Sequence, residues 1–99
     1  MYKGVTPTLI FQFSEDAELD RAREIIVSFT NNKGHTILDL TDVTVENNSI
    51  TVELTQEQTL KMPDYARVQI NWTFIGGKRA CSDIKQISFR DNLYPEVIA

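Results

Sequence analysis

Histidine and cysteine are the side chains that most often act as a base or a nucleophile near neutral pH, and this sequence has one of each. His35 directly follows Gly34, where the chain is expected to turn, so we interpret it as an exposed turn residue. Cys81 is opposite in parity to Ala80, so its side chain either faces outward or belongs to a second face of the strand. It has no neighbouring histidine or cysteine to activate its thiol, and we favour a buried or half-buried, unreactive residue. Because neither residue has a partner for proton transfer in sequence, we predict that the protein is not an enzyme.

Two further patterns resemble ligand-binding motifs. The acidic residues Glu15, Asp16, Glu18 and Asp20 offer carboxylate oxygens for calcium. However, this run lacks the alternating ligands, the central glycine and the final glutamate of an EF-hand loop. The glycines at 76–77 precede a lysine but lack the rest of a phosphate-binding P-loop, and a strand follows them. We therefore expect a solvated acidic loop and a hairpin turn, with no metal and no cofactor.

Composition restricts the class of protein. A chain of 99 residues closes about one hydrophobic core, so residues 1–99 are predicted to form a single domain. The net charge of −4 argues against binding to nucleic acid. No apolar run reaches the roughly 20 residues that span a membrane, and the N-terminus lacks the pattern of a signal peptide. The single cysteine cannot form an internal disulfide, so packing must stabilise the fold.

Alternating apolar residues predict an all-β protein. The clearest strand covers residues 67–74, where Val68, Ile70, Trp72 and Phe74 share one face. This alternation places Trp72 in the core, although an exposed tryptophan on a sheet can also stack on a sugar. Further strands are predicted at 8–13, 24–30, 35–40, 44–46, 49–54 and 78–89.

Turn-forming residues separate these strands. The runs at 31–34, 47–48 and 76–77 are rich in asparagine and glycine, which tolerate positive φ, and each predicts a hairpin. In the returning strand the apolar face shifts parity before Ile87, which predicts a β-bulge near Lys85 and Gln86.

Two short helical segments are predicted between the strands. Thr55 and Gln58 have the spacing of a capping box, so we expect a short helix over residues 56–61 that ends before Pro63. Ser14 is a candidate cap for one helical turn in the acidic loop. About seven short strands with one helical crossover are typical of an antiparallel, immunoglobulin-like β-sandwich with Greek-key connections, and closure into a barrel is the alternative.

The last ten residues, 90–99, show no clear period, and Pro95 limits any strand there to an edge. We interpret this segment as a tail. Its apolar residues either pack back on the domain or meet a partner. The candidate partner-docking residues are Leu93, Tyr94, Val97 and Ile98.

Several segments also carry a family resemblance. They are Gly4–Phe11, Asp42–Leu60, Val68–Trp72, Cys81–Lys85 and Leu93–Val97. In these segments the sequence resembles small sandwich domains encoded among the tail and baseplate genes of phages and prophages of Gram-positive bacteria. Its opening is similar to that of the N-terminal domain of phage baseplate upper proteins, which implies a sandwich fold and a role in assembly. The printed sequence departs from those proteins by carrying no coiled-coil or receptor-binding region after this domain, so we do not expect the resemblance to extend to host recognition.

The resemblance implies a non-enzymatic structural or assembly protein of the phage tail or baseplate region that acts by protein–protein docking. Its partners would be other phage structural proteins or further copies of itself in a homo-oligomer, with no nucleic acid and no membrane. It would be located in the virion, or in the host cytoplasm during assembly. The alternative is a carbohydrate- or ligand-binding module that uses Tyr2, Tyr65 and Tyr94.

Overall fold

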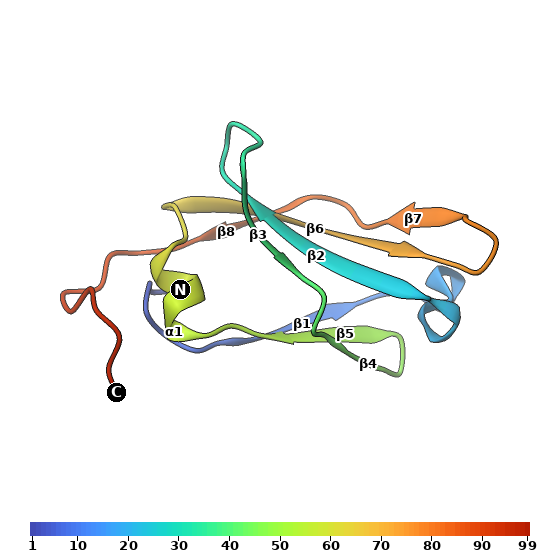
Figure 1. Cartoon of the computed structure of the whole chain (residues 1–99), viewed down its shortest axis with the longest axis horizontal. Coiled ribbons are helices and arrows are strands. Elements are labelled where there is room, and N and C mark those ends of the chain that lie inside the picture. The colour runs from blue at the N-terminus through green and yellow to red at the C-terminus, as the bar shows by residue number, and fades with distance from the viewer.

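The strands form two antiparallel sheets that pack against each other in the computed structural model, which describes residues 1–99 (Figure 1). The strands are β1 (Thr8–Gln12), β2 (Glu24–Thr30), β3 (Thr36–Leu40), β4 (Thr44–Glu46), β5 (Ser49–Glu53), β6 (Tyr65–Thr73), β7 (Arg79–Cys81) and β8 (Lys85–Ser88). The smaller sheet has the order β1-β5-β4. The larger sheet has the order β3-β2-β6, and both β7 and β8 pair with the other side of β6. The predicted all-β fold is confirmed.

Three helical elements connect the sheets. Two are 3-10 turns, η1 (Glu15–Ala17) and η2 (Leu19–Arg21), and they lie at one end of the molecule (Figure 1). The third is α1 (Gln56–Leu60), at the opposite end beside the N-terminus. Its predicted capping box is present, whereas Ser14 makes no side-chain cap for η1. The first turn after Ser14 is instead closed by backbone hydrogen bonding, from the Ala17 N–H to the Ser14 carbonyl.

The core lies between the two sheets and follows the predicted alternation. Ile50 and Val52 of β5 are fully buried against residues of the larger sheet. The rest of the buried apolar set is Leu19, Val27, Phe29, Leu54, Met62, Ala66, Val68, Ile70, Trp72 and Phe89.

All three predicted hairpins are present. Asn47 and Asn48 have φ values of 48° and 65°, the left-handed region that a tight two-residue hairpin requires. Gly76 and Gly77 also have positive φ values, and they lie in the turn between β6 and β7. The hairpin at 31–35 joins β2 to β3.

The bulge in the returning strand lies slightly earlier than predicted. Two residues of β6 face the three residues 82–84, so one extra residue separates β7 from β8. The reason is Ser82, whose Oγ accepts a hydrogen bond from the Ile70 N–H at 2.9 Å and whose own N–H donates to the Ile70 carbonyl at 2.8 Å. The serine therefore ends regular pairing before residues 85–86, where the bulge was expected.

The strand order also differs from the immunoglobulin pattern. That fold places its second strand in the same sheet as the first, fourth and fifth. Here β2 lies between β3 and β6 in the larger sheet. The short turn at 31–35 makes β2 and β3 antiparallel neighbours, which keeps both in one sheet. The immunoglobulin-like assignment is not confirmed, and the two sheets remain separate rather than closing into a barrel.

Candidate functional site

Both residues with the potential for acid–base or nucleophilic chemistry lie on the surface. His35 ends the β2–β3 turn, where its backbone N–H donates to Asn31 Oδ1 at 2.9 Å, and it is exposed as predicted. Cys81 is exposed as well, so the expectation of a buried or half-buried thiol is wrong. Ala80 pairs with Trp72 on the core-facing side of the sheet, and strand geometry therefore turns the next residue outward.

The acidic residues do not converge. The four acidic residues of the run at 15–20 are all exposed. Two lie in η1, one lies in η2, and Glu18 lies between the two turns. Nowhere in the molecule do three histidine, cysteine, aspartate or glutamate side chains group closely enough to hold a metal ion.

A cleft of about 500 Å³ opens between the end of β1 and the β7–β8 segment. Its lining includes Phe13, Trp72 and Lys85. The rings of Phe13 and Trp72 meet edge to face with their centroids 5.2 Å apart, and Trp72 Nε1 donates to the Ala17 carbonyl at 3.1 Å. The predicted core position of Trp72 is confirmed, and these contacts hold the inner wall of the cleft in place.

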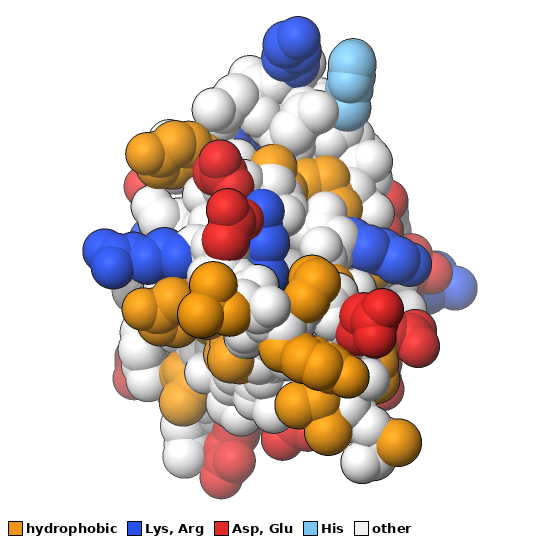
Figure 2. Space-filling view, turned by 90° about the vertical axis from the view of Figure 1, so that its left-hand side faces the viewer, with side chains coloured by type: hydrophobic (Ala, Val, Ile, Leu, Met, Phe, Trp, Pro, Cys, Tyr) orange, Lys and Arg blue, Asp and Glu red, His pale blue; other side chains and the backbone are white.

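The C-terminal tail has apolar side chains that the domain does not cover. Leu93 is fully exposed, and Tyr94, Val97 and Ile98 are 46–66% exposed. Leu93 therefore does not pack back on the domain, whereas Tyr94, Val97 and Ile98 are partly covered by it. Figure 2 shows that hydrophobic side chains gather on the end of the molecule that carries both termini in Figure 1.

The tail is nevertheless fastened to the domain at two points. At its base, Asn92 Nδ2 donates to the Lys3 carbonyl at 3.0 Å, and Asn92 Oδ1 accepts from the Tyr94 N–H at 3.1 Å. Near its end, Gln56 Oε1 accepts from the Ile98 N–H at 2.8 Å, and Gln56 Nε2 donates to the Ile98 carbonyl at 3.0 Å. The glutamine amide pairs with this backbone as a neighbouring strand would, so the segment between the two points is held in one place.

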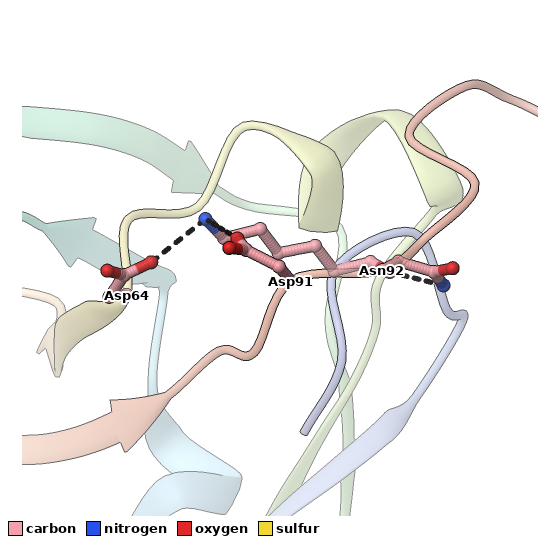
Figure 3. Close-up of polar contacts among 4 residues, drawn as sticks. Asp64, Asp91 and Asn92 are labelled. Carbon is pink, nitrogen blue, oxygen red and sulfur yellow. Dashed lines mark hydrogen bonds and ion pairs between the residues drawn. The ribbon is translucent and has the colours of Figure 1, made fainter.

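Lys3 connects the base of the tail to the residue before β6, and its partners Asp64, Asp91 and Asn92 are labelled in Figure 3. Its Nζ donates to Asp64 Oδ1 at 3.1 Å and to Asp91 Oδ1 at 3.2 Å. The hydrogen bond to Asp64 raises the pKa of Lys3 above its ordinary value; desolvation opposes this rise, and Asp91 adds to it. The N-terminal segment, the residue before β6 and the base of the tail are thereby joined at one cation.

Thr59 holds this N-terminal segment against α1. It is the one polar residue that is fully buried. Its Oγ1 accepts from the Gly4 N–H at 2.9 Å and donates to the Val5 carbonyl, the shortest of its acceptor contacts, at 2.7 Å. Thr59 therefore fixes the residues next to Lys3, and through Lys3 the base of the tail.

Sequence reasoning identified the apolar residues of the tail but missed what positions them. Lys3 and Asp91 are 88 residues apart, and Gln56 and Ile98 are 42 apart. Neither pair belongs to a motif. The one available signal was the capping box, because it assigned Gln58 to the cap and left Gln56 at the first position of the helix with a free side chain.

The site and the fold define an all-β domain of two antiparallel sheets that presents an exposed apolar C-terminal segment. Comparison with protein-family models, with curated proteins and with solved structures found no match. None of the helices has the length and hydropathy needed to cross a membrane.

Proposed function

We propose that this protein is a non-enzymatic docking module, and that its tail binds an apolar pocket on another protein. The observation that carries the proposal is the combination of exposure and attachment at residues 93–98. Apolar side chains point outward while hydrogen bonds at Asn92 and Gln56 hold the segment at each end. A segment that is already ordered loses less conformational entropy on binding, which increases affinity.

Within the segment, Leu93 and Tyr94 are the proposed anchors. Large apolar and aromatic side chains that fill a partner's pocket contribute most of the binding energy in many interfaces. Leu93 is fully exposed and Tyr94 about half exposed, so both are accessible to a partner. Pro95 follows them and restricts the backbone, which further limits the entropy lost on docking.

We further propose that the partner is a structural protein of a phage or prophage tail or baseplate. Support for this assignment comes from the sequence resemblance of segments such as Gly4–Phe11 and Asp42–Leu60 to small domains encoded among tail genes. In this role the protein is a component of the particle or of an assembly intermediate.

The test compares particles assembled with the unaltered chain and with two variants. Leu93→Ser combined with Tyr94→Ser removes the proposed anchors, whereas Ile75→Ser alters an isoleucine that is 86% exposed near the β6–β7 turn. We expect mass spectrometry of purified particles and assembly intermediates to detect the unaltered chain and the Ile75→Ser control, but not the tail variant. Absence of the unaltered chain from both, or equal incorporation of the tail variant, would overturn the proposal.

A carbohydrate-binding module is the second candidate. Tyr2, Tyr65 and Tyr94 are each about half exposed, and the pairing of Tyr2 with Arg90 and of Tyr65 with Ser88 brings two of them to the base of the tail. Binding on a glycan array that is lost on changing these tyrosines to alanine would favour this candidate over docking.

A further inference from the structure

β1 presents an unpaired edge of the smaller sheet (Figure 1). The Phe13 N–H donates to the Asn48 carbonyl at 2.9 Å, and the Leu54 N–H donates to the Pro7 carbonyl at 3.1 Å. In an antiparallel ladder these bonds recur at every second residue, so the odd-numbered residues of β1 face β5. The backbone groups of Thr8, Ile10 and Gln12 therefore point away from the sheet.

The β7–β8 segment faces the end of this edge across a cleft and does not pair with it. The cleft that separates β1 from the β7–β8 segment is lined by residues 11–14 on one side and by 80–83 and Lys85 on the other. β1 has no pairing partner other than β5. The N–H and C=O groups of its three outward residues are thus available to an added strand.

β1 also lacks the features that protect the other edges from strand addition. Exposed charges or short, interrupted strands normally prevent edge-to-edge pairing. The other edge of the smaller sheet is β4, which has only three residues and carries Glu46. In the larger sheet, the edge strand β3 carries Asp39. The edge formed by β7 and β8 is interrupted by the bulge and carries Arg79 and Lys85. β1 has five residues and no charge, and Ile10 at its centre is 62% exposed.

We propose that β1 pairs with β1 of a second copy of this chain, antiparallel and centred on Ile10. In this register Ile10 faces Ile10 of the other copy, and Thr8 faces Gln12. All three are outward-facing residues, so every outward N–H and C=O group of each β1 finds a partner across the two-fold axis.

The side chains suit the same register. On the outer face the two Ile10 side chains are direct cross-strand neighbours, and on the inner face Leu9 lies opposite Phe11. No charged residue faces another. The two smaller sheets become one continuous sheet with the order β4-β5-β1-β1-β5-β4. Pairing of single five-residue strands buries less than the roughly 1,200 Å² of a stable interface, so the dimer is weak and forms at high protein concentration.

This pairing uses β1 rather than the tail, so its test is separate from that of the docking proposal. Sedimentation equilibrium over a concentration series is expected to show a monomer–dimer equilibrium for the unaltered chain. Ile10→Lys and Ile10→Glu each place like charges opposite one another and should raise the dissociation constant about fivefold or more. The matched control Ile75→Lys changes an exposed isoleucine outside β1 and should leave the equilibrium unchanged.

Mixing the Ile10→Lys and Ile10→Glu chains provides the decisive measurement. Only a register that brings position 10 opposite itself places the two new charges together, so the mixture should form a heterodimer at least as strong as the unaltered dimer. A chain that is monomeric at millimolar concentration, a dimer unaffected by either Ile10 variant, or a mixture that stays dissociated would each overturn the proposal. Capture of an extended segment of another protein by β1 without self-association would do so too.

Discussion

The hydroxyl of Thr59 is the buried polar group on which the position of the N-terminal segment depends. Replacing it in Thr59→Val keeps the shape of the side chain and removes the hydrogen bonds to Gly4 and Val5. Each buried group left without a partner costs about 1–3 kcal/mol. Because both backbone groups are only partly buried, the low end applies to each, and the free energy of unfolding should fall by about 2 kcal/mol.

The measurement is urea unfolding followed by the fluorescence of Trp72, together with a thermal melt by circular dichroism. A loss of about 2 kcal/mol corresponds to a fall in Tm of roughly 8–16 °C for a domain of this size. The matched variant Thr59→Ser keeps the hydroxyl and removes one methyl group, so it should cost about 1 kcal/mol or less. The reasoning fails if Thr59→Val is as stable as the unaltered protein, or more stable than Thr59→Ser.

Three further outcomes test the contacts around the site and the core. Gln56→Ala removes both hydrogen bonds to the Ile98 backbone, so the Ile98 amide should exchange with deuterium faster while the free energy of unfolding changes by less than about 0.5 kcal/mol. Trp72→Phe deprives the Ala17 carbonyl of its donor and leaves a small void, so urea unfolding followed by circular dichroism should show a loss of about 2 kcal/mol. Lys3→Met removes a cation whose pKa is raised by its two carboxylate partners, and this cation stabilises the fold fully below the ordinary lysine value of 10.5. The stability advantage of the unaltered protein over Lys3→Met, measured by urea unfolding, should therefore shrink as the pH rises through the higher folded-state pKa.

Each of these outcomes has a result that contradicts it. Unchanged exchange at Ile98 in Gln56→Ala would show that the amide pairing does not hold the tail. Full stability of Trp72→Phe would show that the indole hydrogen bond contributes nothing. If the stability difference between the unaltered protein and Lys3→Met stays constant from about pH 8 to above pH 11, the ion pairs of Lys3 do not stabilise the fold.

The order of neighbouring residues was sufficient to predict the turns, the helix cap and the buried faces of the strands. The turn at Asn47-Asn48 needs two positive φ angles and the capping box needs Thr55 and Gln58 three residues apart, and both are decided within a few neighbouring residues. Alternation likewise decides which side of β6 is buried, because successive side chains of a strand point to opposite faces. For the same reason the core position of Trp72 was predictable from sequence.

Long-range pairing was decided only in the tertiary structure. Nothing local indicates that β1 pairs with β5, or that β2 pairs with β6 in the larger sheet. The outward position of Cys81 depends on a register set by β6, and the shift of the bulge depends on a single serine side chain.

The candidate site divides in the same way. Its apolar residues were evident from the sequence as a tail without a period, whereas their exposure and attachment depend on Lys3 and Gln56, which meet their partners only when the chain has folded. Local hydrogen bonding and side-chain alternation act over a few residues and can be read in order along the chain. Contacts such as Lys3 with Asp91 depend on which distant surfaces the packing of two sheets brings together, and no spacing along the chain encodes them.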